Sequence, residues 1–445
     1  MAKVSSKAKK RTNNSKLEKP RNINRILISL PIIAFLLKMT ILSKVQTMGY
    51  NGSDFENYFN STNGLLRDGF FSKEPLLGYF PAGYPILIWP IALISIGGAQ
   101  TILSVIQSVF FAYATFFFTN KLRNINLSGF AILSSLLISF NPTLSLASLT
   151  VGYEANTASC LMMAIGILFS KNDSDSNKKV YLKAALVAFW LGLGSFMQPR
   201  YLLASLLIIS VYLFCEISAD VKLKIIALSL VVLSVFPSIL VFRNSIAINQ
   251  QIISTNLGVT MRIGAGVKTD GSYERQGPEI PCESATGSDS LSDGDLVRCV
   301  ISWYLNNPSK SIELGLNKAR YFWTPWAGPL QKGTVGRNPA LIYSPVMALN
   351  RSSEAWHNFI YGSLGKLISY LWMFGQLVLL VLGLKRLFAL NRRFTYVIST
   401  PILVAWLISI ATIGDSRFRI PTMSLSLVLQ AAGILWLREK AIKGK

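Results

Sequence analysis

Long apolar runs are the feature that most constrains how this chain can fold. Runs of about 20 apolar residues recur along it, and each is long enough to cross the hydrocarbon core of a bilayer as a helix. Charged residues make up 15% of the 445 residues and hydrophobic residues 51%, which is too little charge for a water-soluble chain of this length. We therefore predict an α-helical polytopic membrane protein.

The apolar runs predict about ten transmembrane (TM) helices. The stretch 84–97 is short and contains Pro85 and Pro90, so we expect it to be a re-entrant or interfacial lead-in. An even number of crossings puts both basic termini on the cytosolic side, as the positive-inside rule expects. The predicted crossings are 26–46, 101–120, 128–147, 150–170, 180–197, 200–217, 223–242, 363–384, 394–413 and 419–437.

The same pattern predicts the division of the chain. Residues 1–25 are polar and basic and are expected to be a disordered cytosolic tail. The net charge of +23 lies largely in such cytosolic parts, so we attribute it to membrane orientation and not to nucleic-acid binding. The other parts are a transmembrane module at 26–242 that includes the first outer loop at 48–85, a mostly helical extracytoplasmic segment at 243–362 between TM7 and TM8, C-terminal transmembrane helices at 363–437 and a cytosolic tail at 438–445.

The first outer loop is the first segment that can carry chemistry. Apolar residues recur there at helical spacing from Phe55 to Leu66, which predicts an amphipathic juxtamembrane helix at the interface. Asp54 stands at its start, and Ser53 with Glu56 forms a capping-box pattern. Capping and catalysis are both open roles for Asp54. They are compatible, because a helix N-terminus keeps a carboxylate ionised.

The predicted topology brings other polar groups to the same outer face. They are the turn that ends at Glu154, the sequence Gln198-Pro199-Arg200, and Gly414-Asp415-Ser416-Arg417. Ionisable groups at membrane depth are costly and are usually functional. An ordinary polar turn, or a salt bridge between Glu154 and Arg200, remains the alternative for each.

Cysteine and histidine usage limits the chemistry. Cys282 and Cys299 lie in the outer segment and can pair there, so a disulfide and two free thiols are both open. Cys160 and Cys215 lie in apolar runs and are expected to be buried. The chain has a single histidine, His357, so a histidine-based triad or zinc site is nearly excluded.

The motif DxENYxNxxxGLLRDGFFS from Asp54, followed by YFPAGYPIL, resembles the GT-C superfamily of polytopic glycosyltransferases. The resemblance is to bacterial members related to protein mannosyltransferases and to the lipid A aminoarabinose transferase. Two motifs depart from the family pattern: the Arg-Pro order is altered at Pro199-Arg200, and Phe418 replaces Tyr. Further similar stretches follow in the same order at 149–154, 198–200, 253–258, 307–308, 318–323 and 414–421.

The resemblance implies a role for each site residue. Asp54 would act as general base on an acceptor hydroxyl and displace the sugar of a polyprenyl-phosphate-linked donor with inversion. Arg200, Arg417 and Arg419 would bind the donor phosphate. Glu56 and Glu154 would shape the acceptor site or, with Asp54, hold a divalent cation; no cofactor is certain. The expected location is the bacterial plasma (inner) membrane with an extracytoplasmic active site.

Two other functions remain open. An O-antigen ligase or polymerase shares the lipid-linked donor but is expected to use outer-loop arginine and histidine. A polyprenyl-lipid transporter or flippase is expected to show repeat symmetry, and no internal repeat is obvious here. The sugar, the acceptor (glycan, lipid or protein), the metal requirement and the oligomeric state are not predicted.

Overall fold

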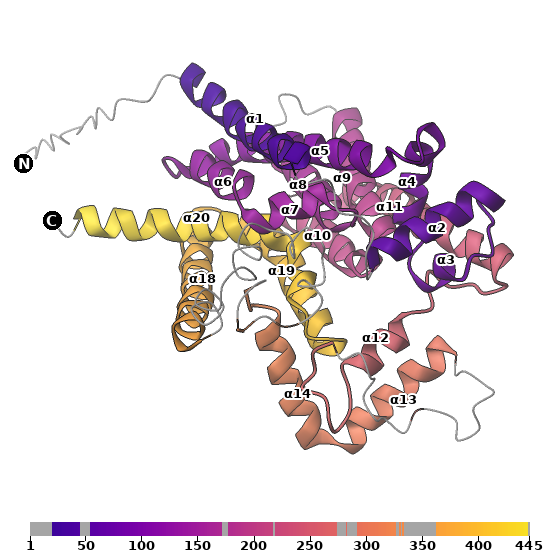
Figure 1. Ribbon diagram of the computed structural model, residues 1–445. Helices are drawn as coiled ribbons and strands as arrows, with labels where there is room; N and C mark the ends of the chain where they lie inside the picture. Colours follow the sequence, from indigo (N-terminus) through magenta and orange to yellow (C-terminus); the bar gives the residue numbers. More distant parts are fainter. Residues whose placement is uncertain are drawn as a thin grey trace, which may run out of the picture.

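The computed structural model describes residues 20–44, 54–170, 177–216, 219–273, 292–325 and 362–443, with 282, 329–330 and 332. Across these ranges the regular structure is helical and contains no strand (Figure 1). This confirms that the chain is α-helical, as predicted.

Helices long and apolar enough to cross a membrane number seven in the described part of the chain. α20 is the central one, because 83% of its apolar window is buried, against 17% for α18 and 22% for α1. The seven are α1 (Pro20–Lys44), α5 (Ala99–Lys121), α9 (Asn177–Met197), α11 (Ala219–Ala247), α18 (Ser363–Leu390), α19 (Arg392–Ala411) and α20 (Ile420–Lys443).

A bent pair of shorter helices is an eighth candidate span. α6 (Phe130–Ser139) and α7 (Pro142–Leu149) meet at an angle of 52°. Asn141 caps α7, since its side chain accepts a hydrogen bond of 3.0 Å from the backbone N–H of Leu144. Irregular backbone at membrane depth is tolerated where it faces protein or a cavity, so this break marks a place of interest.

The predicted count of about ten crossings differs from the observed helices. α8 (Glu154–Leu168) and α10 (Tyr201–Glu216) contain 15 and 16 residues. A perpendicular crossing needs about 17 residues or more. α4 (Gly83–Ile94) contains 12 residues, which suits the predicted lead-in and is too short for a crossing.

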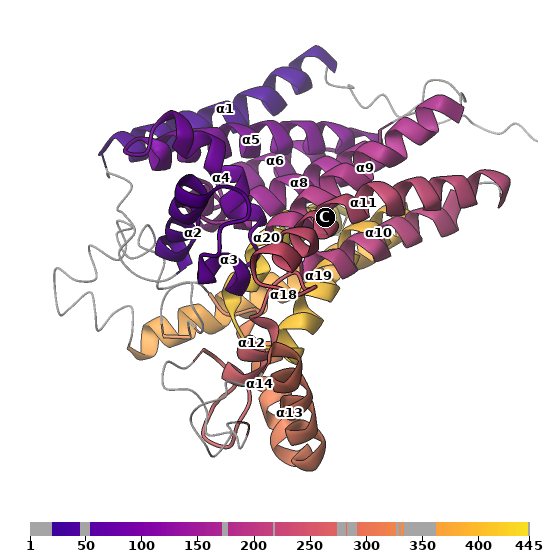
Figure 2. The same ribbon diagram turned by 90° about the vertical axis from the view of Figure 1, so that its right-hand side faces the viewer.

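The outer segment forms a small helical unit. α12 (Leu257–Ile263), α13 (Asp293–Asn306) and α14 (Pro308–Tyr321) lie below the main bundle in both views (Figures 1 and 2). A disulfide joins Cys282 to Cys299. The unit has its own apolar core of Ala265, Cys282, Leu296, Val300, Trp303 and Leu314.

A buried lysine attaches this unit to the bundle. Lys318 of α14 is 1% exposed, and its Nζ donates to the Thr412 carbonyl and the Tyr304 hydroxyl, each at 2.7 Å. Thr412 follows α19 directly and lies two residues before Gly414-Asp415-Ser416-Arg417. The outer unit therefore supports the backbone that carries Arg417.

Candidate functional site

A cavity of about 360 Å³ lies where the first outer loop meets the outer unit and the turn before α20. α2 (Asp54–Asp68) and α3 (Pro75–Tyr79) supply one side, and α12 and the short helix η3 (Ser416–Arg419) supply the other. Its charged and hydrogen-bonding lining residues are Asp54, Asn57, Tyr58, Tyr79, Tyr153, Gln198, Arg200, Asn256, Thr260, Tyr273, Asp415 and Arg417.

Arg417 is the electrostatic centre of the site. Its Nη1 donates to the Asp54 carboxylate and its Nε to the Glu154 carboxylate. Arg417 is 8% exposed and Glu154 is 5% exposed. A buried guanidinium is stable here because two carboxylates compensate its charge. The sequence separations of 363 and 263 residues show that only the tertiary fold joins these groups.

Local capping orients Arg417. Asp415 precedes η3, and its carboxylate accepts a hydrogen bond of 2.8 Å from the backbone N–H of Arg417. Asp415 is 1% exposed, so this cap is protected from water. Arg417 also lies with its guanidinium carbon 5.6 Å from the centre of the Tyr153 ring.

A buried polar network holds the turn that carries Glu154. The Tyr84 hydroxyl donates to Gln107 Oε1 at 2.7 Å and accepts from the Gly152 N–H at 2.8 Å. Gln107 Nε2 donates to the Thr150 carbonyl at 2.9 Å. The glutamate therefore begins α8 at a position set by α4 and α5.

Gly83 lets α4 approach closely enough to supply Tyr84. A Cβ atom at Gly83 would lie 1.9 Å from the Phe196 carbonyl oxygen of α9, a distance that real contacts do not reach. Because Tyr84 is the next residue, a displaced α4 would also displace the network under Glu154.

Arg243 fastens the outer loop at the end of α11. It is 0% exposed and donates to the carbonyls of Phe70 and Leu77, both at 3.2 Å, and to the Ser72 carbonyl. The Phe70 and Ser72 carbonyls lie in the connection between α2 and α3, and the Leu77 carbonyl lies within α3. The arginine thus fixes the path of the loop that leads from α2 to the cavity wall.

Arg200 is the second basic group of the cavity. Its guanidinium stacks on Phe418, with 3.6 Å from the guanidinium carbon to the ring centre. The side-chain amide of Gln198 is oriented with its oxygen toward Tyr153 and Arg200. That oxygen accepts hydrogen bonds from the Tyr153 hydroxyl at 2.7 Å and from the Arg200 guanidinium at 3.2 Å. In this cavity, Nη1 of Arg200 and Nη2 of Arg417 have no hydrogen-bond partner among the residues that the structure describes.

Two tyrosines of the cavity keep their protons. Burial raises the pKa of Tyr58 well above its ordinary value, and the neighbouring Tyr153 and Asp54 add to this. Burial also raises the pKa of Tyr153, against the opposite effect of Arg200 and Arg417. Both phenols are therefore neutral hydrogen-bonding groups at physiological pH and not bases.

The structure brings together four of the sequence-predicted site residues. Asp54, Arg200 and Arg417 line the cavity, and Glu154 contacts Arg417 from its wall. Glu56 lies two residues after Asp54 in α2, is exposed and does not line the cavity. Arg419 lines a different cavity, described below. Ser53 of the expected capping box lies outside the described residues.

A divalent cation does not fit the carboxylates as they lie. Asp54 and Glu154 both bond the Arg417 guanidinium, which occupies the place where a cation would bridge them. No group of three or more His, Cys, Asp or Glu side chains suited to a metal occurs among the residues that the structure describes.

Several supporting residues were not predicted from the sequence. Gln107 and Arg243 have a recognisable signal, because each is a polar or charged residue inside an otherwise apolar helix. Tyr58 and Tyr84 have none, because a tyrosine at a buried position of an apolar helix face is indistinguishable from ordinary core.

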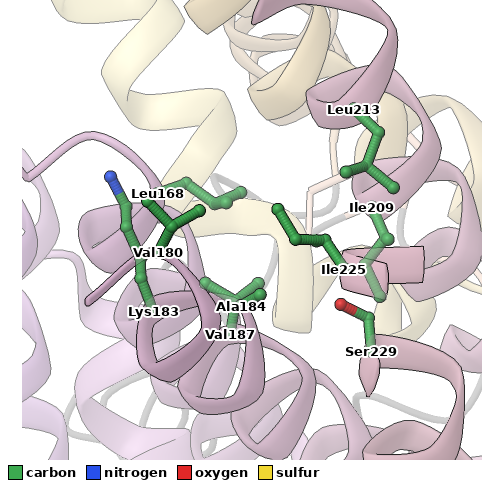
Figure 3. Close-up of a pocket in the computed structure, with 9 residues that line it drawn as sticks. All are labelled: Leu168, Val180, Lys183, Ala184, Val187, Ile209, Leu213, Ile225 and Ser229. Atoms are coloured by element: carbon green, nitrogen blue, oxygen red, sulfur yellow. The ribbon is translucent and has the colours of Figure 1, made fainter. Parts of the chain in front are cut away.

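A smaller cavity between α9, α10 and α11 is apolar (Figure 3). Its volume is about 10 Å³, room for about one water molecule. It is lined by apolar side chains together with Lys183 and Ser229. It is too small for a sugar or a phosphate.

Comparisons with known proteins give structural matches alone. No family model matches the chain, and no curated protein matches it by sequence. Solved structures of the oligosaccharyltransferase AglB from Archaeoglobus fulgidus are similar to it. The complex with an inhibitory peptide and a dolichol-phosphate has a TM-score of 0.46 at 13% identity, covering 93% of this chain and 50% of the archaeal one.

Two further structures of the archaeal enzyme give the same picture. The apo form has a TM-score of 0.48 at 13% identity, covering 93% of this chain and 51% of the other. The form tethered to an acceptor peptide containing the NVT sequon has a TM-score of 0.45 at 14% identity, covering 93% and 50%. The chain spans about half the length of these structures.

Proposed function

We propose that this protein is a membrane glycosyltransferase of the GT-C type. It moves a sugar from a polyprenyl-phosphate-linked donor to an acceptor hydroxyl at the extracytoplasmic face. One observation carries the proposal: a carboxylate at a helix start, Asp54, shares a cavity with two arginines that keep unpartnered donor groups, Arg200 and Arg417. A base beside phosphate-binding groups is the arrangement that such a transfer requires.

The reaction is a single displacement at the anomeric carbon. The acceptor hydroxyl gives its proton to Asp54 while its oxygen forms a bond to the anomeric carbon. The bond from that carbon to the phosphate oxygen breaks, and the carrier leaves as its phosphate. The attack comes from the face opposite the departing phosphate and inverts the configuration.

The arginines stabilise the departing phosphate. A guanidinium matches the geometry of phosphate oxygens, and the open donors of Arg200 and Arg417 can be directed at them. Glu154 keeps Arg417 in place from the protein side. The lipid tail of the donor lies in the bilayer beside the transmembrane helices.

The ion pair between Arg417 and Asp54 has to open for the reaction. In the free protein the Asp54 carboxylate accepts a hydrogen bond from the Arg417 guanidinium. When Arg417 turns toward the donor phosphate, the Asp54 carboxylate is released and can accept a hydrogen bond from the acceptor hydroxyl. Donor binding thereby frees the base.

Asp54→Asn tests the proposal directly. We expect sugar transfer from a radiolabelled polyprenyl-phosphate donor to fall by about 10² to 10⁴ fold, the usual contribution of a positioned base. Asp68→Asn is the matched control, since Asp68 ends the same helix, is exposed and pairs with Arg67. Expression and membrane insertion are compared for both variants.

Unchanged transfer by the Asp54 variant would remove Asp54 from the base role. Movement of intact donor lipid across proteoliposomes, with no release of the sugar, would assign the protein to lipid transport instead.

A further inference from the structure

A second cavity, of about 310 Å³, lies between α18, α20 and the start of α7. It has no part in the reaction described above, because Asp54 and Arg417 do not line it. Its polar lining residues are Asn141, Thr143, Ser369, Gln376, Arg419, Ser426 and Gln430, and its aromatic ones are Trp323 and Trp372.

Arg419 gives this cavity an uncompensated positive charge. The side chain is 2% exposed and donates to the carbonyls of Trp323 at 3.2 Å and Thr324 at 3.4 Å. Its Nε has no hydrogen-bond partner, and it forms no ion pair with a carboxylate in the part of the chain that the structure describes. A buried guanidinium without an anion is costly, in contrast to Arg417 with its two carboxylates.

The surrounding groups also favour an anion. The guanidinium carbon of Arg419 lies 5.6 Å from the Trp323 ring centre and 5.5 Å from that of Trp372, contacts that only partly offset the charge. Gln376 Nε2 is a second buried donor, and it has no hydrogen-bond partner within the described ranges. The N-terminal end of α7, whose dipole favours negative charge, lines the same space at the break in the span.

The cavity adjoins a helix with a strongly apolar exposed surface. α18 exposes Leu367 at 54%, Leu371 at 61% and Phe374 at 68%, and it carries Trp372, which is 40% exposed, at the cavity. Such a surface on a membrane-crossing helix suits acyl or isoprenyl chains. A ligand with an anionic head and apolar chains therefore matches both features.

We propose that this cavity binds the phosphate head group of a bilayer lipid, at a site separate from the Asp54 cavity. Arg417 and Arg419 are two positions apart on a 3₁₀ helix, where residues two apart point in different directions. The short helix η3 thus presents one arginine to each cavity. The head-group phosphate takes the free Nε of Arg419 and the Gln376 amide, and the chains lie along α18.

The test uses the purified full-length chain in detergent, stripped of lipid, with bound molecules counted by native mass spectrometry. The probes are dioctanoyl phosphatidic acid, dioctanoylglycerol with the same chains and no phosphate, and inorganic phosphate. We expect one phosphatidic acid per chain to bind at least 10-fold more tightly than dioctanoylglycerol. Arg419→Gln should weaken this binding at least 10-fold.

Matched variants separate the two cavities and guard against misfolding. Arg200→Gln should leave phosphatidic acid binding unchanged, because Arg200 lines the Asp54 cavity and not this one. Gln376→Leu removes a donor that has no partner and should weaken binding several-fold with the fold intact. Ser369→Phe, which fills the cavity from α18, should prevent binding and serves if Arg419→Gln fails to fold.

Three results would overturn the proposal. Equal binding of the two lipids would show that the phosphate is not recognised. Loss of binding in Arg200→Gln with no change in Arg419→Gln would place the lipid in the Asp54 cavity. This result leaves the proposed sugar transfer untouched, because transfer is measured separately with the radiolabelled donor. Displacement of the lipid by inorganic phosphate at equal concentration would assign the cavity to a free anion.

Discussion

Arg417 has two tasks that conflict. It compensates the buried charges of Asp54 and Glu154 in the free protein, and in the proposed reaction it turns to the donor phosphate. When Arg417 turns, it can release one carboxylate but not both. Glu154 is 5% exposed and would be left as a buried charge, so Arg417 keeps Glu154 and releases Asp54. The greater exposure of the Asp54 side chain, 31%, agrees with this division.

Arg417→Met should destabilise the protein because it leaves two carboxylates facing each other without a cation. Breaking a buried pair in this way costs about 3–5 kcal/mol. The measurement is the thermal unfolding midpoint in detergent. The control is Arg67→Met, which breaks an exposed pair with Asp68 and should leave the midpoint close to that of the parent protein.

The double variant Arg417→Met with Glu154→Gln should recover part of the loss, since one uncompensated charge is gone. Equal midpoints for Arg417→Met and the parent protein would mean that the guanidinium does not stabilise these carboxylates.

Lys318, outside the membrane-crossing helices, makes stability depend on pH. Burial lowers the pKa of Lys318 from 10.5 to about 7. Between these values the unfolded chain binds a proton that the folded chain lacks, so stability rises with pH by up to about 1.4 kcal/mol per unit. Below pH 7 both states are protonated and this contribution is flat.

Lys318→Met should remove that slope between pH 7 and 10. Unfolding midpoints measured across this range check it, with Lys310→Met as control, since Lys310 lies on the same helix and pairs with Glu313. An undiminished slope in Lys318→Met would assign the pH dependence to another group.

Motifs in the sequence locate four residues that the fold brings together, Asp54, Glu154, Arg200 and Arg417. Their roles stay predictions. The sequence could not predict that Arg419 lines another cavity, because direction on a four-residue helix depends on its backbone form, which no motif encodes.

At the scale of elements, hydropathy located the helices but not their breaks. Residues 128–147 read as one apolar run, yet the chain bends between Ser139 and Pro142. The cap residue Asn141 and Pro142 at the first position are a helix-start signal. A window of about 20 residues averages this signal away.

The same averaging explains why the ranges 150–170 and 200–217, which contain α8 and α10, were predicted to be full crossings. Polar residues at their ends are absorbed into the apolar average. Their true bounds depend on the turn at 150–153 and on Gln198-Pro199-Arg200, which the tertiary contacts of Tyr84 and Phe418 hold in place.

Gly83→Ala tests how the packing of α4 controls the site. The added Cβ would clash with the Phe196 carbonyl, so α4 must shift, at a cost of about 1–3 kcal/mol. Because Tyr84 moves with it, we expect transfer activity to fall by about 10-fold or more, in line with the sensitivity of catalysis to small misplacements.

Gly97→Ala is the matched control, since a Cβ there meets nothing within 4 Å. Activity and unfolding midpoint are measured for both variants. Parent-like values for Gly83→Ala would show that α4 does not position the turn at Glu154.

At the scale of the whole molecule, the site requires that distant parts share one side of the membrane. α20 begins beside η3 at the site and runs 24 residues to Lys443. At 1.5 Å per residue it spans about 36 Å, enough to cross the hydrocarbon core once. The site and the end of α20 should therefore lie on opposite sides. The disulfide of the outer unit favours a non-cytosolic compartment for the site.

Cysteine labelling of intact cells tests this topology. Glu56→Cys and Lys440→Cys are both at exposed positions, one beside Asp54 and one near the end of α20. They are introduced singly after replacement of Cys160 and Cys215, with the Cys282–Cys299 disulfide retained. A membrane-impermeant maleimide should label position 56 in intact cells and position 440 only after permeabilisation. Labelling of both positions in intact cells, or of 440 alone, would contradict a single crossing by α20 with an extracytoplasmic site, and the proposed use of a lipid-linked donor at that face would fail with it.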